Sequence, residues 1–422
     1  MRLSLVLMFP FVLGAQQPEI LTLAEAESIA IRNHPRIAAA NSAAEASQET
    51  ARQIRAGLSP LLSANLTASV AEHETRLGAG QLNPSSLFSR TAAGLNISQV
   101  IFDFGRARTL ANSARSRAAA QTELTGVVRA EVLLRVREAY YRGLLAETGL
   151  RVARDTVEAR RLTLRQISTL AASNLRSTLD VSFAELNLSE AELVLDRSEN
   201  DARASLVHLA AALGSNQEPT YQLRDEPIPN PLDGGVELHV AEALRSRPEL
   251  ASLRMNFDAA KQFAESERRQ SFPVFSGTAV GGFFGVRDAR LRPHYGAIGV
   301  NLNIPVFNGS LFTSRRREAE FKAEVANQEV RDLEIRTARD VRAAWIDAEN
   351  ANKRLASTAK LLEHAGKTLR LAQTRYDLGL SSIVELNQAQ LSRAVADVTA
   401  ASAKYEYLIK RAILDYHSGA LR

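Results

Sequence analysis

The chain of 422 residues has no cysteine, few aromatic residues and little net charge. Without cysteine it can form no disulfide bond, and an exported form would lack the thiol that an N-terminal lipid anchor requires. The formal net charge of +5 is too small to indicate nucleic acid as a partner. After the first 15 residues no apolar run reaches about 18 residues, which excludes a transmembrane helix on length. If the protein enters a membrane, it must therefore do so as β-strands.

Signals of catalysis are also missing. The seven histidines are scattered without the spacing of metal ligands, and there are only three methionines. The sequence has neither a G-x-S-x-G elbow nor a phosphate-binding G-x-x-x-x-G-K loop. We therefore expect no enzyme activity, no cofactor and no metal site.

The first residues are typical of a signal for export. Arg2 precedes the apolar run of residues 3–13, and Ala15 follows at a position suited to cleavage. This pattern predicts a signal peptide over residues 1–15.

The remaining chain contains one pattern twice. Residues 100–103 match residues 305–308 at an offset of 205, and the same offset places Asp180 on Glu385. Before the strands, His34-Pro35 matches Arg247-Pro248 at an offset of 213. A duplicated unit of this size sets the architecture. We expect a first repeat over residues 16–213, a proline-rich linker or equatorial segment over 214–235, and a second repeat over 236–422.

Each repeat contains two segments in which apolar and polar residues alternate. They cover residues 62–70 and 93–102 in the first repeat and 274–284 and 297–307 in the second. Alternation with a period of two places one face of a strand against an apolar phase and the other against water, and about ten residues can cross a bilayer. An antiparallel sheet packed on a soluble core is the alternative. Four strands cannot close a barrel, so insertion in lipid would demand oligomerisation.

The rest of each repeat predicts long helices. They occupy residues 105–213 in the first repeat and 310–418 in the second, with helical hairpin tips at Ser173-Asn174 and residues 377–379. At ~1.5 Å per residue, the first arm of each hairpin could reach roughly 100 Å. Shorter helices are expected near residues 24–58 and 240–270, before the strand pairs 62–102 and 274–307. The expected fold class is mainly α with a small β part.

Two motifs give the chain a family resemblance. These are the strand exit of residues 99–105, Gln-Val-Ile-Phe-Asp-Phe-Gly, and the tip sequence from Tyr376 to Gln390, of which residues 174–181 are a reduced copy. With the duplicated strand pair and the signal peptide, the chain resembles the TolC family of outer-membrane efflux proteins. The tip motif is the more specific of the two.

The resemblance implies a homotrimer in which each subunit gives four strands to one twelve-stranded barrel, continued by a long α-helical barrel in the periplasm. It implies a passive exit duct in the bacterial outer membrane, part of a tripartite efflux or type I secretion system. The partners would be a periplasmic adaptor and, through it, an inner-membrane efflux pump or ABC exporter. A periplasmic coiled-coil scaffold that never inserts in the membrane is the alternative function.

Three groups of residues are candidate sites. At the periplasmic gate, a three-fold axis would collect carboxylates that select cations, although each could merely favour its own helix N-terminus. At the two tips, small residues could meet an adaptor hairpin. After the strands, arginines in the opening turns of long helices conflict with the helix dipole and could bind outer-membrane lipid phosphates, or pair with Glu318 and Glu320. The gate candidates are Asp180, Glu385, Gln388 and Tyr376; the tip candidates are Asn174, Leu175, Ser177, Thr178, Gly379, Leu380, Ser381 and Ser382; the lipid candidates are Arg106, Arg108, Arg315, Arg316 and Arg317.

Overall fold

The computed structural model describes residues 19–70, 76–77, 85–86, 89–216, 221–230, 232, 234–287, 289 and 292–421. The expected signal peptide over residues 1–15 lies outside the described residues. Within them, no helix is at once long enough and apolar enough to span a membrane.

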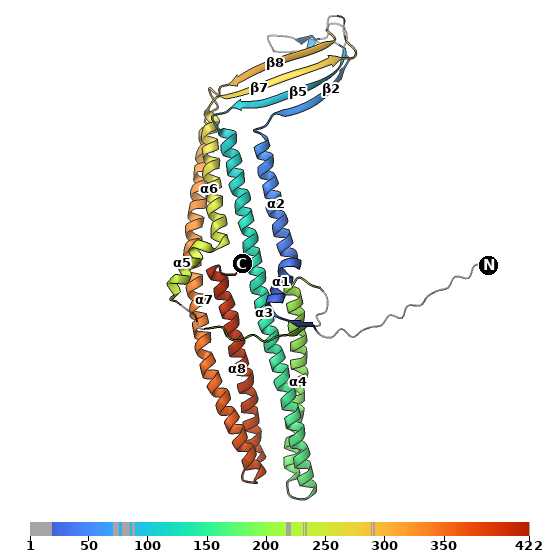
Figure 1. The fold of residues 1–422 in the computed structure, drawn as a ribbon, viewed down its shortest axis with the longest axis vertical. Coiled ribbons are helices and arrows are strands. Elements are labelled where there is room, and N and C mark those ends of the chain that lie inside the picture. Colours follow the sequence, from blue (N-terminus) through green and yellow to red (C-terminus); the bar gives the residue numbers. More distant parts are fainter. Residues whose placement is uncertain are drawn as a thin grey trace, which may run out of the picture. The chain divides into compact units, whose positions relative to one another are not determined.

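The described elements are mostly helices (Figure 1). The helices are α1 Leu23–Asn33, α2 Pro35–Ala56, α3 Arg106–Ala172, α4 Thr178–Ala212, α5 Val236–Ser246, α6 Pro248–Arg268, the 3-10 helix η1 Arg269–Ser271, α7 Leu311–Asp377 and α8 Ile383–Ser418. The strands are β1 Glu19–Leu21, β2 Leu61–Ser69, β3 Arg76–Leu77, β4 Ser85–Ser86, β5 Arg90–Phe102, β6 Tyr221–Leu223, β7 Val274–Phe284 and β8 His294–Asn303.

The chain forms two compact units, and each takes segments from both sequence repeats. The first unit comprises Met1–Ala39, Gly126–Arg247 and Arg336–Arg422, and the second comprises Ala40–Thr125 and Pro248–Ile335. The repeats therefore describe how the sequence is duplicated, whereas the compact units each combine equivalent parts of both copies.

The first unit is held by an apolar core between α3, α4 and α8. Val132, Val136, Leu209 and Leu408 are almost completely buried there. The fully buried Tyr140 places its hydroxyl 2.8 Å from the carbonyl oxygen of Leu21 and 2.7 Å from that of Arg224. Leu21 ends β1 and Arg224 directly follows β6, and these two strands pair in parallel. One tyrosine thus fixes a small sheet against the helical core.

The second unit contains an antiparallel sheet with the strand order β2-β5-β7-β8 (Figure 1). A bulge between Val100 and Phe102 makes Phe102 the partner of Phe275. After it, the rings of Phe102 and Phe104 lie 4.8 Å apart, and those of Phe104 and Phe272 lie 5.2 Å apart. The Arg269 side chain donates to the carbonyl oxygens of Phe104 and Gly105, each at 3.2 Å. Aromatic and charge-assisted contacts together fix the passage from strand to helix.

The backbone repeats the duplication of the sequence. Left-handed residues recur in pairs at the offset of 205 residues, at the strand exits, the hairpin tips and the ends of the returning helices. The pairs are Phe104 with Gly309, Gly105 with Ser310, Asn174 with Gly379, and Gly214 with Gly419. Because a positive φ is costly for most residues, its recurrence at matched positions shows that both copies make the same turns.

The short helices differ from the sequence expectation. The helix expected over residues 24–58 is two helices, broken at His34, and the one expected over 240–270 is broken at Arg247. Both residues are extended, with ψ values of 121° and 124°. Each precedes a proline, which removes an N–H donor and disfavours helical geometry in the residue before it. The expectation of single helices was wrong, although the breaking signal is local.

The fourth strand also has other bounds than expected. The fourth strand was expected over residues 297–307, but β8 covers His294–Asn303. It ends there because its partner β7 begins at Val274, after Pro273, and because Pro305 cannot donate to a sheet. The segment expected over residues 214–235 to be a linker or an equatorial segment contains β6, whose pairing with β1 is non-local.

Candidate functional site

The four-stranded sheet has two chemically different faces. The strand registers place alternate residues of all four strands on the same side. The apolar face carries Leu62, Ala64, Leu66, Ala93, Leu95, Ile97, Phe275, Ala279, Phe283, Ile298, Val300 and Leu302. The polar face carries Ser63, Asn65, Thr67, Asn96, Ser98, Ser276, Thr278, Asn301 and Asn303, together with Val280 and Tyr295. The alternation predicted from the sequence holds over most of the sheet, with Gln99 and His294 as exceptions on the apolar face and Leu61, Val100, Val274 and Phe284 as exceptions on the polar face.

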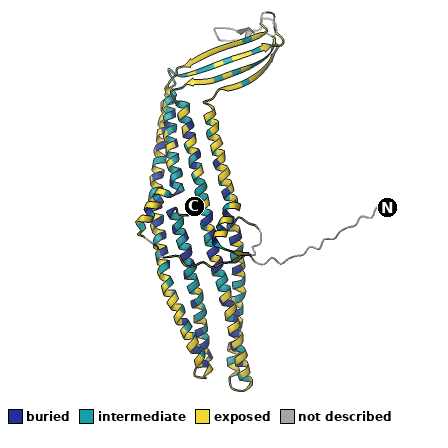
Figure 2. Ribbon diagram, in the orientation of Figure 1, coloured by how far each residue is buried: buried dark blue, intermediate teal, exposed yellow. Residues whose placement is uncertain are grey.

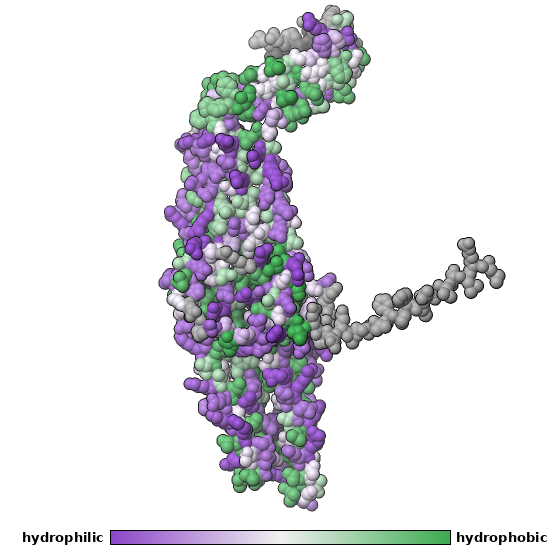
Figure 3. All heavy atoms as spheres, viewed as in Figure 1, coloured by the Kyte–Doolittle hydropathy of each residue, from purple (hydrophilic) through white to green (hydrophobic). Residues whose placement is uncertain are grey.

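The apolar face is uncovered in the single chain. Leu66 is 85% exposed and Ile298 is 88% exposed. Figure 2 shows exposed residues along all four strands, whereas buried residues gather in the helices. In Figure 3, hydrophobic residues are visible on the strands. A contiguous uncovered apolar surface indicates contact with a membrane or with another protein.

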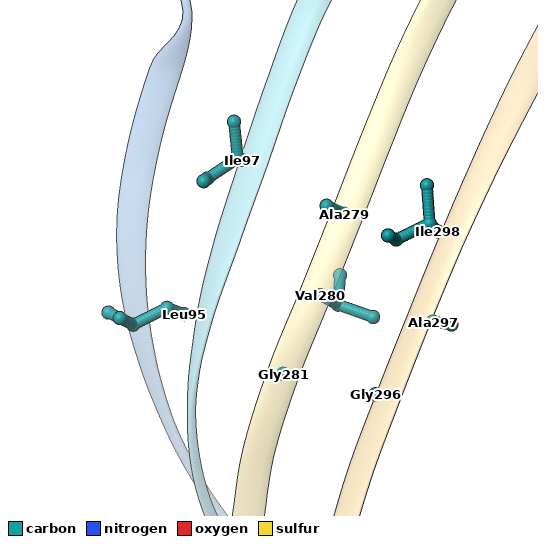
Figure 4. A pocket seen from close by; sticks show the side chains of 8 residues that line it. All are labelled: Leu95, Ile97, Ala279, Val280, Gly281, Gly296, Ala297 and Ile298. Atoms are coloured by element: carbon teal, nitrogen blue, oxygen red, sulfur yellow. The ribbon is translucent and has the colours of Figure 1, made fainter.

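Small residues shape the middle of the apolar face. Figure 4 shows the side chains of Leu95, Ile97 and Ile298 around a shallow hollow whose floor includes Ala279 and Gly281.

Strands β2 and β8 are the two edges of the sheet. Their outer backbone groups have no partner strand in that sheet, which lipid does not tolerate.

The candidate lipid arginines begin with Arg106 and Arg108, in the first turn of α3. Arg106 is half-buried and its Nε has no hydrogen-bond partner, whereas Arg108 is exposed. Asp103 lies directly before them and its carboxylate accepts the N–H groups of Gly105 at 3.0 Å and Ala107 at 2.6 Å. This acid satisfies the helix start and offsets the unfavourable position of the arginines.

The second basic cluster comprises Arg315, Arg316 and Arg317, all exposed on α7. Arg316 forms an ion pair with Glu320 at 2.9 Å, as the solvated alternative expects. Glu318 forms an ion pair with Lys322, and the charges of Lys322 and Arg315 lower the pKa of its carboxyl group. The structure therefore pairs one of the three arginines with an expected glutamate.

At the hairpin tips, several of the residues predicted to contact an adaptor form turns and helix caps. Asn174 and Gly379 have φ values of 54° and 73°, in the left-handed region. The hydroxyls of Ser177 and Ser382 accept backbone N–H groups at the starts of α4 and α8. Leu175 and Leu380 are 70% and 66% exposed. Among the remaining tip candidates, Thr178 is exposed, and Ser381 is half-buried with an unpartnered Oγ.

The gate carboxylates are engaged locally. Asp180 forms a capping box with Ser177, whose N–H donates to its carboxylate at 3.4 Å. Glu385 lies in the first turn of α8 and forms an ion pair with Arg375 at 3.1 Å. Both carboxylates therefore stabilise helix starts, as the alternative interpretation expects. Gln388 is exposed one turn further along α8.

Tyr376 joins the two hairpins. It is 5% exposed and packs in a cluster with Ile167 of α3, Ala184 of α4, and Ile383 and Leu386 of α8. The guanidinium carbon of Arg176, from the first tip, lies 4.9 Å from the centre of the Tyr376 ring. Burial raises the pKa of the Tyr376 hydroxyl, which has no hydrogen-bond partner. A cation–π contact and an apolar cluster thus hold the two tips together.

One contact of this region was not predicted. Arg160 of α3 is 7% exposed and donates to the side-chain oxygen of Asn387 on α8, and to its carbonyl oxygen at 3.4 Å. Burial lowers the pKa of Arg160. The partners are 227 residues apart, so only the fold reveals the contact. Asn387 lies within the tip motif, but its neighbours gave no sign of a buried guanidinium.

Comparison with known proteins gives consistent matches. A family model described as "Outer membrane efflux protein" matches residues 27–215 and 240–420. The alkaline protease secretion protein AprF of Pseudomonas aeruginosa is 24% identical over 425 residues, covering 95% of this chain and 85% of AprF. The structure of the outer-membrane channel OprN has a TM-score of 0.80 at 17% identity, covering 94% of this chain and 89% of OprN. That of the Vibrio cholerae outer membrane protein VceC has a TM-score of 0.75 at 20% identity, covering 94% and 96%. The fold is that of these outer-membrane proteins.

Proposed function

The chain belongs to the outer membrane efflux protein family, and from this membership we propose that three copies form a passive exit duct across the bacterial outer membrane. An inner-membrane efflux pump or ABC exporter supplies the energy, and a periplasmic adaptor connects it to the duct. Most of the mass lies in the periplasm. AprF is named for protease secretion. The proposed duct therefore serves either secretion by a type I system or efflux.

The two-faced sheet with open edges is the observation that carries this proposal. Its apolar face suits lipid, and its polar face suits a water-filled lumen. Strands β2 and β8 remain unpaired at the edges, so one chain cannot insert alone. Pairing β8 of each copy with β2 of the next closes a ring, and three copies give twelve strands. A non-inserted scaffold would have no use for an apolar sheet face.

Cysteine cross-linking tests this closure, because the chain has no cysteine of its own. One cysteine is placed on β2, at Asn65, and one on β8, at Asn301, both on the polar face. Neighbouring positions on β8 are scanned to find the register. Under mild oxidation of outer-membrane fractions we expect covalent dimers and trimers, and nothing larger.

The control places the two cysteines at Ser98 and Thr278, which are partners on the inner strands β5 and β7. This pair should form a disulfide within one chain and give no covalent dimers or trimers. If no register of the edge pair yields trimers while the control pair oxidises, the ring closure is wrong. Trimers found only in a soluble periplasmic fraction would instead favour the scaffold.

The exposed hairpin tips are the proposed adaptor surface. Gly379, Leu380 and Ser382 leave the backbone accessible at one tip, and Leu175, Ser177 and Thr178 do so at the other. Leu380→Glu should abolish export while trimers still assemble, because Leu380 is largely exposed. Export that survives this change and Leu175→Glu would place the docking surface elsewhere.

The arginines after the strands are proposed to bind lipid phosphates at the membrane surface. Arg315, Arg316 and Arg317 are all exposed, and a basic residue near an anionic surface can gain about 1 kcal/mol. Replacing Arg315, Arg316 and Arg317 by glutamine should reduce insertion into liposomes that contain anionic lipid, and not into neutral liposomes. Equal insertion of wild type and variant at both compositions would exclude this role.

A further inference from the structure

One row of residues crosses the polar face of the sheet near the loop ends of its strands. Asn65 pairs with Gly94, Gly94 with Gly282, and Gly282 with Tyr295. A large aromatic side chain on β8 is therefore followed across the sheet by two residues without side chains. Glycine inside a strand weakens it, so two glycines opposite one another indicate a close approach by some other group.

The approaching group is the phenol of Tyr295. A Cβ atom on Gly94 would lie 2.2 Å from the Tyr295 hydroxyl oxygen and 3.1 Å from its Cζ. A Cβ atom on Gly282 would lie 2.6 Å from the same hydroxyl oxygen. The ring therefore extends along the wall over both glycines instead of projecting from it. Its centre lies 5.0 Å from that of Phe284 at an angle of 35°, which supports it from one side.

We propose that Gly94 and Gly282 form a seat that holds Tyr295 flat against the inner wall, and that this seat sets the free width of the duct at this level. The inference rests on the proposed function, in which the polar face lines the lumen. In a trimer, three such rings lie on the wall together. Filling the seat would turn each phenol into the lumen and make Tyr295 a size filter for cargo.

Accessibility of a cysteine deeper on the polar face tests the seat. Ser276→Cys lies on β7 beyond the Tyr295 row as seen from the loop ends of the strands. Small and bulky maleimides are added from outside to intact cells. We expect Gly94→Ala to lower the rate of reaction with the bulky reagent several-fold, and to leave the rate with the small reagent nearly unchanged.

Gly299→Ala is the matched control, because Gly299 also lies on the polar face, opposite Thr278, and a Cβ atom there would have no neighbour within 4 Å. It should not alter either rate. Gly282 is unsuitable for substitution, since a Cβ atom would lie 2.3 Å from the carbonyl oxygen of Ala93 and would disturb the sheet itself.

A double variant separates the phenol from backbone strain, because a Cβ atom on Gly94 would also lie 2.9 Å from the carbonyl oxygen of Gly281. Adding Tyr295→Ala to Gly94→Ala should restore the rate of reaction with the bulky maleimide, whereas Tyr295→Ala alone should change that rate little. If the double variant stays slow, or if Gly94→Ala matches wild type, the seat is refuted. If Ser276→Cys in assembled wild-type trimers reacts with neither reagent, the lumen assignment itself fails.

Discussion

At the scale of single residues, His34 joins two helices and carries a titratable group at the joint. Its extended backbone ends α1, and its Nδ1 accepts the N–H of Arg36 at 3.1 Å, at the start of α2. Partial burial lowers the pKa of His34, and the charges of Arg36 and Arg135 lower it further. The neutral ring is thus the form that the folded chain uses, because a protonated Nδ1 cannot accept a hydrogen bond.

The start of α2 should therefore loosen in acid. Since the folded pKa lies below the ordinary value of 6.5, the stabilisation is complete above that value and is lost as the pH falls through the folded pKa. Amide hydrogen exchange of residues 36–40, corrected for intrinsic rates, should show lower protection near pH 5.5 than near pH 7.5. His34→Asn keeps an acceptor that does not titrate and should remove the difference. The exposed His364→Asn should leave it unchanged, and equal loss in all three proteins would exclude His34 as the cause.

At the scale of elements, the same joint occurs in both repeats. A Cβ atom on Gly214, which ends α4, would lie 2.8 Å from Cα of His34. A Cβ atom on Gly419, which ends α8, would lie 2.9 Å from the Oγ of Ser246 and 3.2 Å from Cγ of Arg247. In each copy, the glycine that ends the returning helix packs against the break between the two short helices. Proline makes that break and glycine fits against it, which ties the two ends of each repeat.

Gly214→Ala should destabilise this joint by about 1–3 kcal/mol, because it combines a left-handed φ of 80° with a clash against backbone. Gly149→Ala is the control. Gly149 lies inside α3 with no atom within 4 Å of a Cβ position, so alanine there should stabilise by about 0.5–1 kcal/mol. Guanidinium unfolding of the detergent-solubilised protein measures both. The same sign for both substitutions would contradict the packing argument.

At the scale of the whole molecule, predictability followed the range of the interactions. Duplication, strand alternation and the two tips were predicted because neighbouring residues carry their signals, such as Ser382 before α8 and Gly379 in the turn. The pairing of β1 with β6, the contact of Arg160 with Asn387 and the covering of Gly94 by Tyr295 could not be predicted. Each depends on residues far apart in the chain whose types alone do not specify a partner.

The tip carboxylates have consequences for the assembled duct. Asp180 and Glu385 lie in the first turns of α4 and α8, yet the proposed trimer would still bring six carboxylates to its periplasmic mouth. The double variant Asp180→Asn and Glu385→Gln retains amide oxygens for capping and removes the charges. Cation preference, measured as the reversal potential in a KCl gradient across a planar bilayer, should fall clearly. An unchanged reversal potential would assign both residues to capping alone. If the double variant does not form trimers, the reversal potential is measured for each single variant instead.

The matched left-handed turns also give the helical hairpins of the two repeats equal chain lengths. From Phe104 to Asn174 and from Gly309 to Gly379 the chain advances by the same 70 residues, and from each tip to its closing glycine it advances by 40. An insertion in one arm would shift one tip relative to the other by ~1.5 Å per residue and pull Arg176 away from Tyr376. The reach of the hairpins can therefore change only by equal steps in all four arms. Seven residues per arm, about two helical turns, would return each side chain to within about 20° of its original face.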